Sequence, residues 1–287
     1  MKMTMLNGSP VPAAEASLHV SDLGLLRGYA VFDYFRIIEG IPLFIEDYLG
    51  RFERSVARLN LDLPFSQADL REQVLELITL NGATHAGMKL LMTGGYSEDG
   101  YSPANPNLLI LMSPYKKPDE HLYSEGATLI THEFVRDIPE VKTTNYAVAI
   151  SLLPQQRKAG AIDILYHQNG LVSETARSSI FALKNGVLVT PGERILKGVT
   201  RKQVLDLARK HYDVVETNLS LSDVLQADEV FITSSIKGVM PIVKIDVTTI
   251  GSGRPGKVAK HLMDLFGDHV DQYVKTHNAN VQPPVRG

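Results

Sequence analysis

The chain has 287 residues, 44% of them hydrophobic, which is enough to bury a sizeable core and is typical of two domains. A formal net charge of −3 gives no field that would attract a phosphate backbone or anionic lipid, so we expect neither nucleic acid nor membrane as a partner. The absence of cysteine excludes disulfides and thiolate chemistry, and the nine histidines form no His-x-x-x-His pair, so we expect no metal site. Without a signal peptide or spanning segment pattern, we expect a cytoplasmic protein.

The first part of the chain mixes strand and helix patterns. Ser17 to Gly28 is expected to be a loop, and Glu39-Gly40 a hairpin turn between two strands. Ser66 and Asp69 resemble a capping box, and Gly82 is placed to end the helix that this box begins. The predicted strands are Met1 to Leu6, Ala30 to Ile38, Ile41 to Phe44, Met88 to Thr93 and Leu108 to Met112, and the predicted helices are Glu46 to Leu59 and Ser66 to Gly82.

A polar, proline-punctuated stretch from Pro114 to Glu120 is the best linker candidate. We therefore predict a small N-terminal α+β domain over residues 1–117 and a larger cofactor-binding α+β domain over 118–277, with a disordered tail over 278–287. In the second domain, Asn169-Gly170 and Asn185-Gly186 predict hairpins. The strands expected there are Ala127 to Phe134, Asp163 to His167, Leu171 to Ser173, Ile180 to Leu183 and Val187 to Val189, and the helices are Tyr146 to Lys158, Thr200 to His211 and Gly256 to Tyr273.

Two segments carry side chains suited to catalysis. Lys142 lies between a strand and a helix, where a loop can present a reactive amine, although a lone lysine is more often a solvated surface residue. Glu174 ends a strand and is followed by small hydroxyl residues, which suits pairing with a cationic ring nitrogen. A solvated glutamate at a sheet edge would give the same pattern.

Two further segments suit an anion. Leu196 to Arg201 opens a helix, whose free amide groups and dipole favour a phosphate, and the Thr200 hydroxyl can add a donor. Thr233-Ser234-Ser235 follows a strand and could close on the same phosphate. Each pattern alone is common in proteins of many functions.

Taken in chain order, these segments resemble the class IV aminotransferases, the fold type IV pyridoxal-phosphate enzymes. The resemblance runs from about Leu6 to Phe266, and the D-amino-acid aminotransferases are the subgroup that it favours. It implies a two-domain α+β fold with pyridoxal 5'-phosphate in the cleft between the lobes. The matching segments are Asn7-Gly8, Gly28 through Phe32-Asp33 to Arg51-Phe52, Lys142-x-x-Asn145-Tyr146, Ser173-Glu174 with Ile180-Phe181, Gly198 to Arg201, and Thr233-Ser234-Ser235 with Pro241.

The resemblance also implies a role for each matching residue. Lys142 would form the Schiff base with the cofactor and move the proton, Glu174 would pair with the pyridine nitrogen, and Tyr146 would lie beside the phenolic oxygen. The phosphate would be held by four groups: Arg51, the amide of Val199, Thr200 and Ser235.

Three departures from the family pattern bear on the substrate. Asp33 replaces the usual glutamate and Ser179 the common asparagine, while Thr93 to Tyr101 lacks the arginine and histidine that hold the substrate carboxylate in well-known D-amino-acid aminotransferases. The replacement candidates are three cations in or beside matching loops: Arg27, Arg177 and Lys237. Structural ion pairs of Arg27 and Arg177 are an equally good explanation.

The predicted function is transfer of an amino group between an amino acid and a 2-oxo acid, both small molecules. D-amino acids such as D-alanine and D-glutamate, with 2-oxoglutarate as acceptor, are favoured. A branched-chain L-amino-acid aminotransferase is the second interpretation and an aminodeoxychorismate lyase the third, while a cofactor-binding protein without catalysis is the alternative from another class. The resemblance implies a homodimer, to which Arg27 could contribute across the interface.

Overall fold

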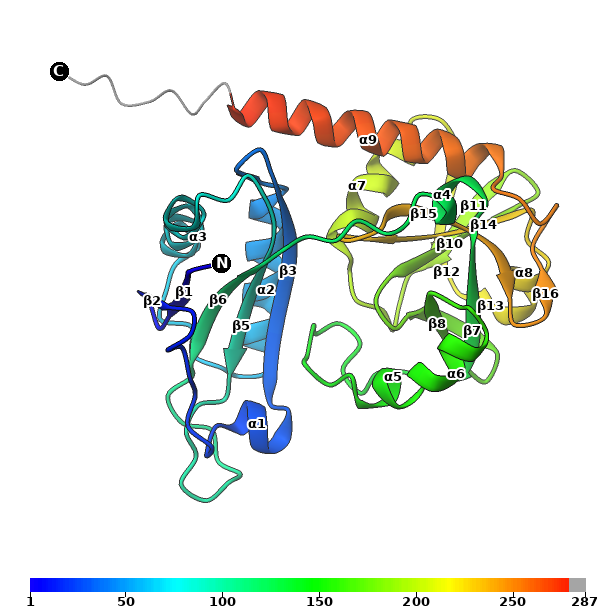
Figure 1. Ribbon diagram of the computed structural model, residues 1–287. Helices are drawn as coiled ribbons and strands as arrows, with labels where there is room; N and C mark the ends of the chain where they lie inside the picture. The colour runs from blue at the N-terminus through cyan, green and yellow to red at the C-terminus, as the bar shows by residue number, and fades with distance from the viewer. Residues whose placement is uncertain (279–287) are drawn as a thin grey trace. The chain divides into compact units, whose positions relative to one another are not determined.

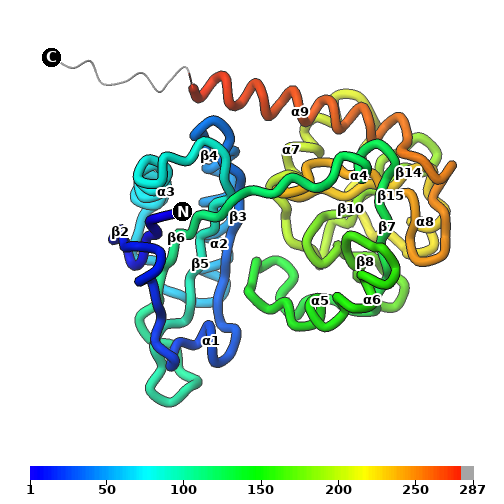
Figure 2. Tube along the Cα trace, in the orientation of Figure 1, coloured from blue at the N-terminus to red at the C-terminus, as the bar shows by residue number. Residues whose placement is uncertain are grey.

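The computed structural model describes residues 1–278 and contains both helices and strands, which confirms the α+β fold class (Figure 1). Its internal contacts define two compact units. The first unit comprises Met1–Lys116, Val141–Asn145 and the described residues from Val270 onward, and the second comprises Lys117–Glu140 and Tyr146–His269. The chain therefore returns to the first unit twice, around Lys142 and in the last helix. The Cα trace in Figure 2 follows the chain from β6 (Leu108–Ser113) to α4 (His121–Ser124), between which it first changes units.

The sequence predicted a single division of the chain at 117/118. A polar, proline-containing stretch indicates where the chain leaves one unit. Its composition does not indicate which later segments pack back into that unit. The structure differs from the prediction by placing Val141–Asn145 and the end of the last helix in the first unit. Asn278 ends that helix, and the rest of the predicted tail lies outside the described residues.

The first unit contains a six-stranded sheet in which all neighbouring strands are antiparallel. Helix α2 packs against β3, and α3 contacts both α2 and β1 (Figure 1). The strand order is β2 (Ser9–Pro12), β1 (Met3–Leu6), β6 (Leu108–Ser113), β5 (His85–Thr93), β3 (Ala30–Ile38) and β4 (Ile41–Pro42), and the helices are α1 (Leu23–Arg27), α2 (Ile45–Arg58) and α3 (Gln67–Asn81).

The expected helix signals are present in α2 and α3. Leu49, Phe52 and Val56 lie on one face of α2 and are fully or almost fully buried. At the start of α3 the Ser66 side chain accepts from the Asp69 amide while the Asp69 side chain accepts from the Ser66 amide, which completes the predicted capping box.

The segment that was expected to be a loop contains the short helix α1. Asp22 caps its first turn by accepting from the Gly24 amide at 2.7 Å, and Gly28 ends it with a φ of 64°. Asp22 is fully buried, and its other carboxylate oxygen accepts hydrogen bonds from Thr93 and Asn107. A helix of five residues has no apolar periodicity, so the sequence pattern did not reveal it.

The second unit contains a ten-stranded mixed sheet. Three pairs of neighbouring strands in it are parallel: β11–β12, β15–β7 and β7–β8. The main strand order is β12 (Asp213–Thr217), β11 (Val187–Pro191), β10 (Ser179–Lys184), β14 (Glu229–Ser234), β15 (Gly238–Ile245), β7 (Ala127–Glu133), β8 (Asp163–Gln168), β9 (Leu171–Thr175) and β13 (Leu219–Ser220), with β16 (Thr248–Thr249) beside β15. The helices are α4 (His121–Ser124), α5 (Ala147–Ser151), α6 (Leu153–Lys158), α7 (Val199–Ala208), α8 (Leu221–Leu225) and α9 (Lys257–Asn278).

Both faces of β10 are buried, as its continuous apolar run indicates. Phe181 belongs to a core cluster with residues of α7 and α9, and its ring stacks on that of Phe231 at 4.8 Å. Ile180 and Ala182 point into a second cluster on the other face of the sheet. Side chains on both faces of β10 therefore pack into the core of the second unit.

The Asn-Gly turns occur as predicted. Asn169-Gly170 joins β8 to β9 and Asn185-Gly186 joins β10 to β11, and all four residues have φ values between 50° and 79°. Two consecutive positive φ values match the twist of an antiparallel hairpin, and Asn and Gly tolerate them best. None of the helices in the described part of the chain is both long and apolar enough to cross a bilayer.

Candidate active site

In the first unit, Lys142 is held by β3. The Phe32 amide donates to the Lys142 carbonyl at 2.9 Å, and the Thr144 amide donates to the Ala30 carbonyl at 3.1 Å. An antiparallel bridge joins Val31 to Thr143 between these two bonds. The Lys142 segment thus extends the sheet locally, and its backbone position is set by residues more than a hundred positions earlier in the chain.

The half-buried Lys142 side chain lies over an aromatic ring. Its Nζ is 4.6 Å from the centroid of the Phe32 ring, and its amide donates to the Ser55 hydroxyl at 3.4 Å. Lys89 places its own Nζ 5.5 Å from the same ring but from an exposed position. The two lysines differ in burial rather than in their aromatic neighbour.

Arg51, which the sequence analysis assigned to the phosphate, projects from α2 into the interior of the first unit. Its Nε donates to one oxygen of Asp33 at 2.9 Å and its Nη2 to the other at 2.5 Å. Both residues are buried, so this is a two-point pair with fixed geometry. A guanidinium also matches the geometry of a phosphate, which is the role that the resemblance implies for Arg51.

In the second unit, Glu174 lies at the end region of β9 and is buried. Its Oε1 accepts from Arg136 Nε at 2.8 Å and from Arg136 Nη2 at 2.6 Å, and its Oε2 accepts from the Leu196 amide at 3.1 Å. Arg136 is itself fixed by a bond to the Pro139 carbonyl. Arg136 was not predicted from the sequence, because an arginine in a proline-containing loop gives no local sign of its partner.

Tyr146 precedes α5 in the second unit and is half-buried. Burial raises the pKa of its phenol, and the charge on Glu174 raises it further against the opposing effect of Arg136. The phenol is therefore protonated at neutral pH and can donate a hydrogen bond to an anionic oxygen.

The start of α7 has the features of an anion site. Gly198 is the N-cap residue and no side chain caps the helix, whose first residues Val199 and Thr200 are buried. A Cβ atom on Gly198 would lie 2.9 Å from the Ser179 hydroxyl oxygen, so the backbone approaches Ser179 closely.

The hydroxyl-rich segment at the end of β14 lies next to Ser179, the residue that the start of α7 approaches. Thr233 pairs with Ser179 in the register of β10 and β14. The Thr233 hydroxyl is buried and has no hydrogen-bond partner among residues 1–278. An unsatisfied hydroxyl beside an uncapped helix start is a donor set suited to a phosphate, so the second unit fits the phosphate of the cofactor that the resemblance implies.

The three candidate cations for a substrate carboxylate have different surroundings. Arg27 is exposed at the end of α1, and its Nε donates to the Gly100 carbonyl at 2.9 Å. Arg177 is 53% exposed and donates to the Ile162 carbonyl at 3.0 Å. Lys237 is only 10% exposed, and its Nζ lies 2.9 Å from Asp163 Oδ2. Arg177 and Lys237 belong to the second unit, and Arg177 is the more exposed of these two cations.

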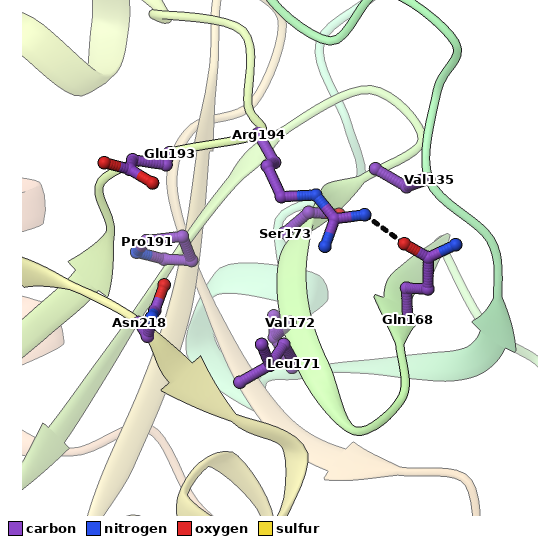
Figure 3. A pocket seen from close by; sticks show the side chains of 9 residues that line it. All are labelled: Val135, Gln168, Leu171, Val172, Ser173, Pro191, Glu193, Arg194 and Asn218. Atoms are coloured by element: carbon purple, nitrogen blue, oxygen red, sulfur yellow. Dashed lines mark hydrogen bonds between the residues drawn. The ribbon is translucent and has the colours of Figure 1, made fainter.

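A small pocket opens beside β9 near Ser173 (Figure 3). Arg194 reaches over it and donates to the Gln168 side chain. The volume of this pocket, about 20 Å³, is enough for roughly one water molecule, so the pocket is not a cofactor site. Within the described residues, no group of three or more His, Asp or Glu side chains is arranged to hold a metal ion.

Comparison with known proteins identifies relatives along nearly the whole chain. The family model described as amino-transferase class IV matches residues 30–245. The D-alanine aminotransferase of Bacillus licheniformis is 29% identical, over 93% of this chain and 96% of its own. A putative branched-chain-amino-acid aminotransferase of Methanocaldococcus jannaschii is 32% identical, over 92% of this chain and 94% of its own.

Among solved structures, the branched-chain amino acid aminotransferase of Escherichia coli has a similar fold, with a TM-score of 0.88 and 25% identity over 94% of each chain. A second branched-chain amino acid aminotransferase, solved with pyridoxamine 5'-phosphate, aligns with a TM-score of 0.87 and 26% identity, again over 94% of each chain. Both solved relatives are branched-chain amino acid aminotransferases, whereas a D-alanine aminotransferase is among the relatives in sequence.

Proposed function

The chain belongs to the class IV aminotransferase family, whose cofactor is pyridoxal 5'-phosphate, and on this premise we propose that its amino donors are D-amino acids. D-alanine and D-glutamate are the proposed donors, and 2-oxoglutarate is the proposed acceptor.

The observation that carries this proposal is the accessible guanidinium of Arg177, three residues after Glu174. A cation at this point in the chain favours a small polar or acidic substrate over a purely aliphatic one. The likeness to a D-alanine aminotransferase over 93% of the chain supports the same choice.

The bound cofactor supplies a ring that accepts electrons while the amino group is exchanged. Lys142 is assigned two roles: its Nζ amine holds the cofactor aldehyde, and the same Nζ moves a proton. Its place over the Phe32 ring and its backbone bonds to β3 fix the direction of approach of this amine.

Glu174 is assigned the anion that faces the pyridine nitrogen. Its two bonds from Arg136 hold one carboxylate oxygen, and the Leu196 amide holds the other, so the side chain is oriented before any ligand binds. The Tyr146 phenol is assigned the donor to the phenolic oxygen of the cofactor.

The phosphate is assigned to Arg51, the Val199 amide, Thr200 and Ser235, with Thr233 as an addition from the structure. Thr233 joins this group because its hydroxyl is buried without a partner in the described chain. Asp33 positions the guanidinium of Arg51 through two hydrogen bonds.

A branched-chain L-amino-acid aminotransferase is the second candidate, favoured by the 32% identity to the Methanocaldococcus jannaschii protein. Parallel assays with D-glutamate, D-alanine and L-leucine, each with 2-oxoglutarate, separate the two. Turnover of L-leucine without turnover of either D-donor would overturn the D-amino-acid proposal. Pyruvate release from aminodeoxychorismate without an amino acceptor would instead indicate the lyase.

The assignment of Lys142 has a matched control in Lys89. We expect Lys142→Ala to lose the visible absorbance of lysine-bound cofactor and to lower turnover by about a thousandfold or more. Lys89→Ala removes the other amine near Phe32 and should leave both properties intact. Unchanged turnover in Lys142→Ala would refute the assignment.

Of the three candidate cations, the accessible Arg27 and Arg177 are assigned the carboxylate of the substrate, and Lys237 is replaced as well because its Nζ is already bonded to Asp163 and Ser178. Replacing each in turn by a neutral residue should raise the KM for the amino donor where the charge is used. A KM that stays at the wild-type value after one replacement excludes that residue.

A further inference from the structure

Asp163 begins β8 and is buried, with only 1% of its side chain exposed. Its Oδ2 accepts from Lys237 Nζ at 2.9 Å and from the Ser178 hydroxyl at 3.4 Å. Lys237 Nζ also donates to the Ser178 hydroxyl at 3.0 Å. These three side chains form a closed cluster, and neither Asp163 nor Ser178 belongs to the segments that resemble known cofactor-binding motifs.

A buried ion pair of this kind needs both partners. Burial opposes the charge of Asp163, but the attraction of Lys237 and Arg177 outweighs it and holds the pKa of the carboxyl below its usual value. Removing the carboxylate would leave a buried ammonium without a counter-ion, and the chain would have to move to solvate it.

The cluster joins two loops that carry proposed cofactor ligands. Lys237 lies in the turn between β14 and β15 that contains Ser235, and its amide donates to the Ser234 hydroxyl at 3.2 Å. The Lys237 carbonyl accepts from the Tyr123 hydroxyl at 2.9 Å, so the turn is also held from its backbone side.

Ser178 lies in the loop between β9 and β10, four residues after Glu174. The Ser178 carbonyl accepts from the Thr175 amide at 2.8 Å, which closes this loop tightly onto the end of β9. A side chain that fixes Ser178 therefore limits the movement of the strand end that presents Glu174.

We propose that Asp163 is a positioning residue for the cofactor, holding the Ser235 turn and the loop after Glu174 in place through Lys237 and Ser178. This inference rests on the roles proposed above for Ser235 and Glu174. It adds that Lys237 acts as the anchor of the turn, while the accessible cation of this cluster is Arg177, whose Nε lies 3.9 Å from Asp163 Oδ2.

The test measures cofactor binding rather than turnover alone. Cofactor-free wild type and variants are titrated with pyridoxal 5'-phosphate, and the dissociation constant is taken from the visible absorbance. We expect Asp163→Asn to raise this constant by about tenfold or more. Asp163→Glu keeps the charge and should recover part of the affinity.

A double variant separates positioning from a general effect on stability. Asp163→Leu with Lys237→Met replaces the buried pair by apolar side chains, which restores the melting temperature of the cofactor-free protein in many such replacements. We expect the double variant to recover the melting temperature but to keep a dissociation constant about tenfold above that of wild type. Asp223→Asn breaks the more exposed pair with Lys184 and should leave the dissociation constant for the cofactor unchanged.

Two outcomes would overturn the inference: an Asp163→Asn protein that binds the cofactor as tightly as wild type, or a double variant that recovers affinity together with melting temperature. If Asp163→Asn does not fold, the affinity of the double variant for the cofactor alone decides whether the inference holds. Failure of the proposed function gives a different result, since wild type itself would then bind no cofactor or turn over none of the D-donors.

Discussion

The carboxylate of Glu174, the proposed partner of the cofactor nitrogen, is held by protein donors on both of its oxygens. Arg136 and the Leu196 amide hold its two oxygens from different sides. Because both donors are present before a ligand binds, no reorganisation of Glu174 is needed to face a positively charged nitrogen.

This arrangement predicts a specific effect of Glu174→Gln. The amide retains the shape of the side chain but cannot stabilise a protonated ring, so we expect kcat to fall by about a hundredfold or more while cofactor still binds. Stopped-flow or steady-state kinetics with saturating cofactor would measure it. Glu193→Gln, at an exposed position of the small pocket beside β9, is the control, and an equal loss in both variants would contradict the assignment.

At the same scale, the sequence predicted candidate functional groups but not the residues that hold them in place. Glu174 and Thr200 stand in short local motifs, so a pattern of neighbours was enough to select them. Arg136 and Asp163 act on residues 38 and 74 positions away, Glu174 and Lys237 respectively. Such pairs depend on which strands become neighbours, and no local motif encodes that.

Helix ends provide a prediction at the scale of single elements. Gly82 ends α3 in the left-handed region with a φ of 58°, whereas Gly267 lies within α9 with no atom close to where a Cβ would be. We expect Gly82→Ala to lower the free energy of unfolding by about 1 kcal/mol and Gly267→Ala to raise it by about 0.5–1 kcal/mol. Thermal or denaturant unfolding would show shifts of opposite sign, and shifts of the same sign would refute the argument.

A second prediction concerns the contact of α7 with β12. Glu216 on β12 accepts from the buried Arg201 at 2.8 Å and from Arg209 at 2.6 Å. Burial opposes ionisation of Glu216, but the hydrogen bonds from the two arginines outweigh it and hold the pKa of the carboxyl below its ordinary value of 4.5.

The sign of the pH effect follows from this lowered pKa. The stabilisation by Glu216 is complete above the unfolded-state value and is lost as the pH falls through the folded-state value. We expect Glu216→Gln to cost about 1–3 kcal/mol near neutral pH, with the difference from wild type shrinking below about pH 4.5. Denaturant unfolding across this pH range measures it, and a difference that grows towards acid would contradict the prediction.

Most elements followed from local patterns, and the exceptions have physical causes. The hairpins with Asn-Gly turns were predicted because consecutive positive φ values demand those residues. Helix α1 was missed because five residues are too few for an apolar stripe, and its cap depends on Asp22 reaching Thr93 and Asn107 far along the chain. The strands β12 and β15 were also not predicted, and β15 has eight residues, so the missed elements are not all short.

For the whole molecule, assembly is the main prediction. We expect the 31.6 kDa chain to form at least a homodimer, with Arg27 acting across the interface. Light scattering coupled to size exclusion should give a mass of about twice that of the chain. A monomer with full activity would refute the assembly, and an Arg27→Ala dimer with an unchanged KM would refute the role of Arg27.

The boundary between the units shows the limit of a linear division of the chain. A linker near Pro114 to Glu120 was predicted from composition, and the contacts change units between Lys116 and Lys117. The return of Val141–Asn145 to β3 rests on backbone bonds to Ala30 and Phe32, which strand propensity does not predict.

The seating of Lys142 on β3 has a consequence for building hybrid enzymes. A chimera made by joining the first 116 residues of one relative to the remainder of another would set a foreign lysine segment against the parent's Ala30 to Phe32. Recombination designs should therefore transfer 141–145 and the end of α9 together with the N-terminal fragment. Crossovers that ignore this rule should yield proteins that express but misplace the lysine proposed to hold the cofactor.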